Sequence, residues 1–266
     1  TGTVAFDPTD DSTYEGNETA GISVSGVSGG GASESGSQAV TITITDNESA
    51  PTVTLATAST SIDENSDSTI TLTATVSTAT FQDVTVSIDG TGGTGTEGTD
   101  FGTVSDITVS AGSTTGTVTF DPTDDSIYEG NETAGISVSG VSGGGASESG
   151  TQAVTITITD NESAPTVTLA TSATSIAENA GSSLTLTATL SVATTADVTV
   201  ALSTSGTATE GTDYTDGSGV VNDITISAGS TTGTVNFTPT DDSVYEGDET
   251  ATITVSGVSG GSATES

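Results

Sequence analysis

The chain of 266 residues contains no lysine, arginine or histidine, although 36 of its residues are aspartate or glutamate. Cysteine, methionine and tryptophan are absent as well. Without cationic side chains to neutralise phosphates, binding to nucleic acid or to anionic membranes is disfavoured. Without cysteine there are no disulfides, and without histidine there is no usual zinc, haem or copper ligand set and no Ser–His nucleophile pair.

The apolar content is low, with 30% hydrophobic and 3% aromatic residues, and composition alone is close to that of disordered chains. The order of residues argues for folding. Segments 71–76, 133–139 and 153–159 alternate apolar and hydroxyl side chains, which is the pattern of a strand with one buried face. No segment has a helical period or the apolar length of a membrane span. The sequence therefore predicts an all-β protein with no direct membrane insertion.

Internal repetition organises the chain. Residues 1–57 and 115–171 differ at only three positions, and a more diverged copy begins at Thr232. The segment Ser-Ala-Pro-Thr-Val-Thr-Leu-Ala at 49–56 returns at 163–170, and its proline fits the start of an edge strand. We therefore expect the C-terminal part of one domain at 1–48, a complete domain at 49–162, and a domain lacking its last strand at 163–266. A window from a longer tandem array would have this organisation.

Seven strands are predicted within 49–162, with glycine-rich turns at 90–98 and 140–150. The predicted strands lie near 52–56, 68–76, 84–88, 106–110, 115–121, 133–139 and 152–159. Seven short strands separated by turns are typical of an immunoglobulin-like β-sandwich. We expect tandem sandwiches of this type.

Acidic residues gather in four short motifs, each near a strand end. In the complete domain these residues are Glu64, Asp100, Asp124, Asp125, Glu129, Glu132, Asp160 and Glu162. The third domain repeats the first three motifs as Glu178, Asp213, Asp241, Asp242, Glu246 and Glu249, and the N-terminal part has the last two as Asp10, Asp11, Glu15, Glu18, Asp46 and Glu48. Crowded carboxylates repel one another unless they share a cation. Oxygen-only ligands suit a hard cation, and Ca²⁺ fits better than Mg²⁺, which keeps more of its waters.

These motifs resemble those of the Calx-β domains, the calcium-binding modules of sodium–calcium exchangers that also occur in integrin β4 and bacterial surface proteins. The resemblance rests on Glu64, Asp100, the run D-D-x-x-x-E-x-x-E from Asp124 to Glu132, and the closing Asp-Asn-Glu at 160–162. It implies a sandwich that binds a cluster of Ca²⁺ ions through these residues. It further implies that Ile127, and Val244 at the equivalent place, each offer a backbone carbonyl. Asn161 departs from the family pattern, because its amide oxygen can ligate but brings no charge.

Tyr14, Tyr128 and Tyr245 stand between the acidic residues of the repeated run. Carbohydrate stacking is one interpretation. The favoured interpretation is an anchor at the edge of the core, like the tyrosine corner of immunoglobulin sandwiches.

The leading hypothesis for function is a calcium-stiffened extracellular array, a stalk or fibre segment of a cell-surface adhesin or filament, bacterial and in a calcium-rich or saline medium. Its partners would be neighbouring repeats of the same chain. Two alternatives stay open, a calcium-sensing regulatory module and a homopolymeric fibre subunit that contacts identical chains through edge strands. An enzyme is disfavoured, because only a carboxylate pair is present for acid–base chemistry and a metal explains those groups better.

Overall fold

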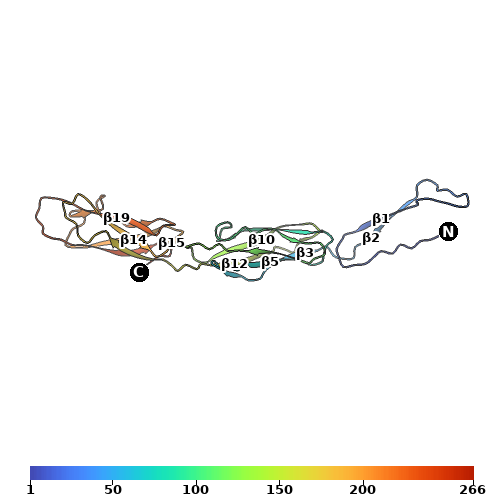
Figure 1. Ribbon diagram of the computed structural model, residues 1–266, viewed down its shortest axis with the longest axis horizontal. Helices are drawn as coiled ribbons and strands as arrows, with labels where there is room; N and C mark the ends of the chain where they lie inside the picture. Colours follow the sequence, from blue (N-terminus) through green and yellow to red (C-terminus); the bar gives the residue numbers. More distant parts are fainter. The chain divides into compact units, whose positions relative to one another are not determined.

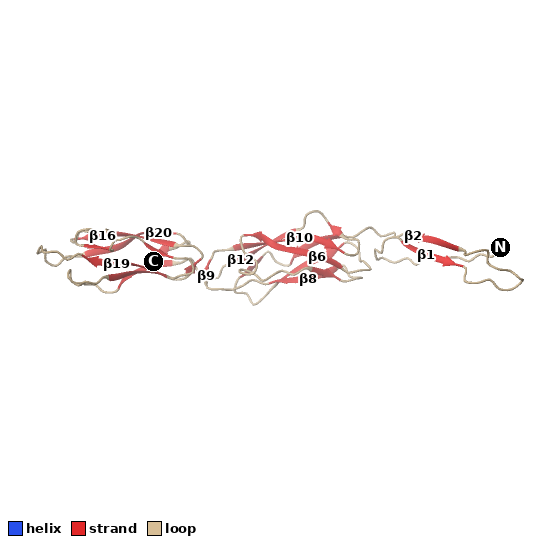
Figure 2. Cartoon of the chain, turned by 90° about the horizontal axis from the view of Figure 1, so that it is seen from above, coloured by secondary structure: helices blue, strands red, loops and turns tan.

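A computed structural model describes all residues, 1–266, as strands and loops (Figure 2). No helix is long and apolar enough to cross a membrane. We call residues 49–162 the middle repeat and 163–266 the C-terminal repeat. The domain boundaries expected from the sequence stay predictions.

The middle repeat contains two sheets (Figure 1). The first has the order β11-β3-β5-β8, with β3 Thr52–Thr57, β5 Ile70–Val76, β8 Thr115–Phe120 and β11 Ser147–Glu148. The second has the order β4-β12-β10-β6-β7, with β4 Ser61–Asp63, β6 Val84–Gly93, β7 Ile107–Val109, β10 Glu132–Ser142 and β12 Ala153–Thr159. Strand β3 pairs antiparallel with β5, which pairs antiparallel with β8.

The inward faces of both sheets form one core. In β5, Ile70, Leu72, Ala74 and Val76 are buried while the intervening threonines lie outside or half outside, as the period of two requires. The opposite sheet supplies residues such as Ile136, whose side chain is fully buried. The alternation predicted from the sequence therefore corresponds to the buried face.

All seven predicted strands of the middle repeat are present, which confirms the immunoglobulin-like sandwich. Two expected turns are partly wrong. Strand β6 runs to Gly93 and β10 runs to Ser142, so each continues into a segment that the sequence analysis assigned to a turn. The glycines there allow close pairing: Gly92 and Gly135 face each other, and a Cβ on Gly135 would lie 2.8 Å from the Gly92 carbonyl carbon.

The C-terminal repeat has the same two-layer plan. One sheet has the order β17-β19-β14-β13-β21, with β13 Thr166–Thr171, β14 Leu184–Leu190, β17 Tyr214–Thr215, β19 Thr232–Pro239 and β21 Thr264–Glu265. The other has the order β18-β16-β20, with β16 Val198–Gly206, β18 Ile224–Ile226 and β20 Ala251–Ser259. Tyr214 stacks on Phe237 at the core with ring centroids 4.6 Å apart.

Residues 1–48 contain a single hairpin of β1 Glu18–Ser23 and β2 Ala39–Ile44, paired antiparallel. None of its apolar side chains is fully buried, and Val40 is 60% exposed. Two further short strands, β9 Ile127–Tyr128 and β15 Ala193–Thr194, pair with each other in parallel.

Spatial contacts divide the chain into two compact units. The N-terminal unit holds residues 1–62, 66–123 and 133–158. The C-terminal unit holds residues 63–65, 124–132 and 159–266. Three acidic segments of the middle repeat, which contain Glu64, Asp125 and Asp160, thus belong to the same unit as strands β13 to β21.

The close approach of Gly135 to Gly92 yields a stability test. Replacing Gly135 by alanine should lower the free energy of unfolding by about 1–3 kcal/mol, because the added methyl meets backbone that cannot move aside. Gly21 occupies the equivalent place in the N-terminal hairpin, in the same local sequence, and a Cβ there meets nothing within 4 Å. Gly21→Ala should change stability by less than about 0.5 kcal/mol in denaturant titrations followed by circular dichroism. Equal losses for the two variants would contradict the packing described.

Candidate metal centres

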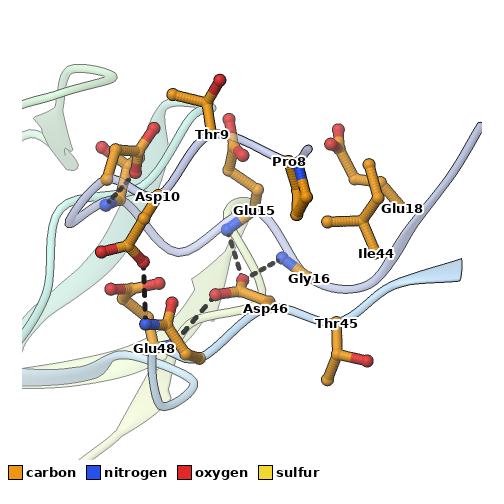
Figure 3. Close-up of a pocket in the computed structure, with 13 residues that line it drawn as sticks. Pro8, Thr9, Asp10, Glu15, Gly16, Glu18, Ile44, Thr45, Asp46 and Glu48 are labelled. Carbon is orange, nitrogen blue, oxygen red and sulfur yellow. Dashed lines mark hydrogen bonds between the residues drawn. The ribbon is translucent and has the colours of Figure 1, made fainter. Parts of the chain in front are cut away.

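The six acidic residues predicted in the N-terminal part line one cavity of about 240 Å³ (Figure 3). They are Asp10, Asp11, Glu15, Glu18, Asp46 and Glu48. They come from the loop before β1, from β1 itself and from the segment after β2. The antiparallel pairing of β1 with β2 brings these segments together, since Glu18 lies opposite Ile44.

Asp46 is the centre of this arrangement. Its Oδ2 accepts hydrogen bonds from the backbone N–H groups of Glu15 at 2.8 Å and Gly16 at 2.5 Å (Figure 3). Its Oδ1 accepts from the N–H of Glu48 at 2.9 Å. The Glu48 N–H is the largest of the effects that lower the pKa of Asp46. Backbone donors thus hold this carboxylate ionised where no basic side chain exists.

The local sequence explains how the donors reach Asp46. Gly16 has φ +73°, a left-handed conformation that other residues rarely adopt, and this turn directs consecutive N–H groups to one oxygen. Asn17 follows, and its Oδ1 accepts the N–H of Asp46 at 3.1 Å. Glu15 and Gly16 therefore donate to the carboxylate of Asp46, and Asn17 accepts its backbone N–H.

The middle repeat reproduces this arrangement around Asp160. Its Oδ2 accepts from the N–H groups of Glu129 and Gly130, and its Oδ1 accepts from the N–H of Glu162 at 2.8 Å. The N–H of Asp160 donates to Asn131 Oδ1 at 3.3 Å. The predicted ligand Asp160 is thus fixed in place by backbone groups of the predicted ligand loop.

Glu64 is the most buried of the predicted ligands, with 6% of its surface exposed. It follows β4 directly, and its N–H donates to the carbonyl of Thr159 at 2.9 Å. Its Oε1 accepts from the N–H of Asp125 at 3.0 Å. Burial raises the pKa of Glu64, and the negative charges of Asp160 and Asp125 raise it further.

Glu162 carries an orphaned buried oxygen. Its Oε2 is sealed from solvent and has no hydrogen-bond partner. Carboxylate oxygens of Glu64, Asp160 and Glu162 lie within 4.8 Å of one another. Burial is the largest effect that raises the pKa of Glu162, followed by its contact with Asp160 and repulsion from Glu64. Three carboxylates thus converge on a point that no protein cation reaches.

The Asp-Asp pair of the repeated run is ordered by its own loop. The second aspartate accepts the N–H of the residue two places later, so Ile127 donates to Asp125 at 2.7 Å and Val244 donates to Asp242 at 2.6 Å. The first aspartate of the middle repeat, Asp124, accepts from the side-chain nitrogen of Asn161 at 2.9 Å. In the N-terminal part, Asp10 accepts from Asn47 in the same way.

The C-terminal repeat brings its predicted residues into two overlapping groups. In each group the carboxylate oxygens lie within 4.8 Å of one another, and the members are Glu178, Asp242 and Glu246 in one and Asp213, Glu246 and Glu249 in the other. Repulsion from Asp213 is the largest effect that raises the pKa of Glu246. Asp241 is exposed and belongs to neither group.

Asp100 occupies the same local position as Asp213. Each aspartate accepts, through Oδ2, the N–H of the threonine four places earlier, Thr96 or Thr209, at 2.6 Å. Glu129 and Glu132, the equivalents of Glu246 and Glu249, are half-buried. The repeat equivalence therefore extends to the loop that positions this aspartate.

Two expectations from the sequence need revision. Gly130 and Asn131, with Gly16 and Asn17 before them, position the closing aspartate, although the sequence analysis assigned them no role; the repeated Glu-Gly-Asn was the available signal. The favoured interpretation of the tyrosines as core anchors is wrong. Tyr128 lies in β9 and pairs outside its own sandwich, and Tyr245 is 97% exposed.

The donor set fits a hard cation. All candidate ligand atoms are oxygens, most are anionic, and Glu162 Oε2 is buried with no proton donor near it. A cation at such a point satisfies the orphaned oxygen and removes the repulsion among the carboxylates.

Substituting Glu162 tests this interpretation of its buried oxygen. In excess chelator, Glu162→Gln should raise the melting temperature, because it removes one of several charges that repel one another. In millimolar calcium the same variant should melt below the unaltered protein, because a ligand is lost. Asp67 is exposed and belongs to none of the carboxylate groups, so Asp67→Asn serves as the charge-matched control and should shift both melts little. Shifts of the same sign in both media for Glu162→Gln would contradict a cation site.

Comparisons with known proteins gave matches to one family model and to several solved structures. No curated protein matches the chain. Among solved structures, CBD12 from CALX1.2 is 19% identical with TM-score 0.35, covering 67% of this chain and 72% of that one. The calcium binding domain CBD12 of CALX1.1 is 18% identical with TM-score 0.35, covering 74% and 77%, and the apo-form Calx CBD1 domain is 18% identical with TM-score 0.36, covering 42% and 99%. The family model of the Calx-beta domain matches residues 46–162 and 160–264, and the chain belongs to the Calx-beta domain family.

Proposed function

We propose that the chain is a calcium-stiffened structural array, a segment of an extracellular stalk or fibre of an adhesin or filament. The observation that carries the proposal is the buried, unpartnered Oε2 of Glu162 among the carboxylates of Glu64 and Asp160. A chain without any basic side chain has no cationic side chain to place beside that oxygen. Membership of a family whose domains bind Ca²⁺ supports calcium as the ion.

The residues that would hold calcium are those predicted from the sequence. In the middle repeat they are Glu64, Asp100, Asp124, Asp125, the carbonyl of Ile127, Glu129, Glu132, Asp160, Asn161 and Glu162. By repeat equivalence, Asp100, Glu129 and Glu132 take the part that Asp213, Glu246 and Glu249 take in the C-terminal repeat. Bound calcium supplies positive charge and oxygen coordination; the chain supplies placement, through the backbone N–H groups that fix Asp160.

Stiffening follows from where these residues belong in the fold. The segments 63–65 and 124–132 group with strands of the C-terminal repeat in one compact unit. Without a cation, mutual repulsion of their carboxylates works against that grouping. A cation shared among Glu64, Asp160 and Glu162 would hold the end of one repeat together at the start of the linker to the next, which begins at Glu162.

Near-identical repeats favour a spacer over a chain of distinct binding sites. Residues 1–57 and 115–171 differ at three positions, so an added copy contributes length and no new chemistry. The net charge of −36 favours a medium rich in calcium and salt, where ions both occupy the sites and screen the remaining charge. We place the protein outside the cell, on a bacterial surface, with neighbouring repeats as its partners.

Calcium should stabilise the fold by mass action. With a dissociation constant of about 10⁻⁴–10⁻³ M, 10 mM calcium adds about 1.4–2.7 kcal/mol for each site. Excess chelator should therefore lower the melting temperature sharply in differential scanning calorimetry. Sodium chloride of equal ionic strength is the control, because it screens charge without occupying the sites. A melt that is the same in chelator and in calcium would refute the calcium role.

Solution scattering tests the structural role separately. The chain should give a narrower distribution of dimensions in 10 mM calcium than in chelator, while titration calorimetry on the same sample reports binding. Calcium binding with unchanged scattering would refute the stalk and leave the binding intact. A graded change that is complete at micromolar calcium would instead identify a sensor.

A further inference from the structure

The repeated acidic run contains a second structural feature beside its carboxylates, a short segment that ends in tyrosine. We call the dipeptides 13–14, 127–128 and 244–245, each ending in the tyrosine of that run, the tyrosine segments. The first is paired with residues 79–81 of the middle repeat, between β5 and β6. The N–H of Tyr14 donates to the carbonyl of Ala79 at 2.8 Å, and the N–H of Phe81 donates to the carbonyl of Tyr14 at 3.4 Å. Tyr14 thereby forms a parallel bridge with Thr80.

The second tyrosine segment makes the same contact one repeat later. Residues Ile127 and Tyr128 form β9, which pairs in parallel with β15, and Tyr128 lies opposite Thr194. Thr194 is the repeat equivalent of Thr80, so the register is the same at both places. The same register at two places in the chain indicates that the sequence specifies this strand pairing.

The accepting edge is preformed within its own repeat. Thr80 and Thr194 are polar yet buried, with 0% and 2% of their surface exposed. Each hydroxyl donates to the backbone carbonyl two residues later, of Gln82 or Ala196. The backbone carbonyls of the two threonines themselves accept the N–H of a turn glycine, Gly112 or Gly229, at 2.8 Å. These bonds hold a short extended edge open to an incoming strand.

A glycine turn accommodates the first ring. A Cβ on Gly145 would lie 2.6 Å from Cε1 of Tyr14, so the ring packs where only glycine leaves room. The equivalent position of the C-terminal repeat is Ser262, which has φ +53°. The C-terminal repeat therefore has a serine side chain at the place where the middle repeat has a glycine.

The third tyrosine segment, 244–245, has the same sequence pattern but is not paired with a strand edge. Tyr14 and Tyr128 are half-buried, whereas Tyr245 is 97% exposed and Val244 is 60% exposed. Both acceptor edges of the chain, at Thr80 and Thr194, already carry a tyrosine segment. Nothing in the chain remains to cover Tyr245.

We propose that the tyrosine segment is a docking strand whose partner is another copy of this same repeat. Its backbone extends the partner's edge in parallel, and the ring of Tyr14 also packs against the glycine turn of its partner. The exposed segment at Val244–Tyr245 is a surface for one further repeat, which presents the equivalent of residues 79–81. The contact consists of backbone hydrogen bonds and a ring, so it acts without a carboxylate and goes beyond the calcium role.

Hydrogen exchange in the full chain tests the docking. In Tyr14→Ala, the amides of residues 14 and 81 should exchange about tenfold faster, because the ring that shields this strand pair is lost. Tyr128→Ala should do the same at the equivalent residues, 128 and 195. Tyr245→Ala is the matched control, since that ring contacts no acceptor, and it should leave all four amides unchanged.

A glycine pair gives a second test that leaves the tyrosine in place. Gly145→Ala should speed exchange at residues 14 and 81, because its methyl occupies the position of the Tyr14 ring. Gly31 is its repeat equivalent, with φ +70°, and a Cβ there would meet nothing within 4 Å. Gly31→Ala introduces the same left-handed strain and should leave the Tyr14 pair protected.

Calcium binding, measured by calorimetry on the same variants, separates this proposal from the calcium role. Faster exchange with retained calcium binding supports docking. Unchanged exchange in Tyr14→Ala and Tyr128→Ala overturns it, whatever the calorimetry shows. Joint loss of protection and calcium binding in both variants also overturns it, because the segment would then serve only the metal site. Protection that falls on dilution would overturn docking within one chain.

Discussion

Negative charge that no side chain can offset is the constraint on which the rest of the structure depends. In most proteins an aspartate beside a glutamate finds a lysine or arginine within reach, and here there is none. The internal hydrogen-bond donors are the backbone N–H groups, a few side-chain amides and the many serine and threonine hydroxyls. Asp46 and Asp160 each take three backbone N–H groups, and even Asp83 and Asp106, outside the acidic clusters, cap the N–H groups of Ala111 and Ile88.

Backbone donors serve aspartates better than glutamates. The short aspartate side chain can reach the N–H two residues away, as Asp125 reaches Ile127, whereas the longer glutamates accept N–H groups from residues further along, as Glu148 accepts the N–H of Gln152. Burial is the largest effect that raises the pKa values of Glu64 and Glu162, and repulsion from Asp213 is the largest effect that raises that of Glu246. Aspartates order their own loops, and aspartates and glutamates together form the carboxylate groups that could hold a cation.

Much of this could be predicted from the sequence, and the reasons are specific. Alternation of apolar and hydroxyl residues identified the seven main strands, because burial of one face enforces a period of two. Repetition of acidic motifs at strand ends identified the residues that gather in the N-terminal cavity and in the C-terminal repeat. The extension of β6 and β10 could not be predicted, since it depends on Gly92 and Gly135 meeting across two strands far apart in sequence. The environment of Tyr14 could not be predicted from the sequence either, because it is formed by residues of the next repeat.

The parallel pairing of Tyr14 with Thr80 and of Tyr128 with Thr194 has a consequence for the order in which the chain acquires structure. Tyr14 and Tyr128 pair with strand edges, at Thr80 and Thr194, that are synthesised more than 60 residues later. The strand pairing of each tyrosine segment can therefore form only after the following repeat has begun to fold. Contacts between residues so distant along the chain form slowly. Folding would therefore proceed repeat by repeat from the N-terminus. The tyrosine segment of the most recently synthesised repeat would still be unpaired.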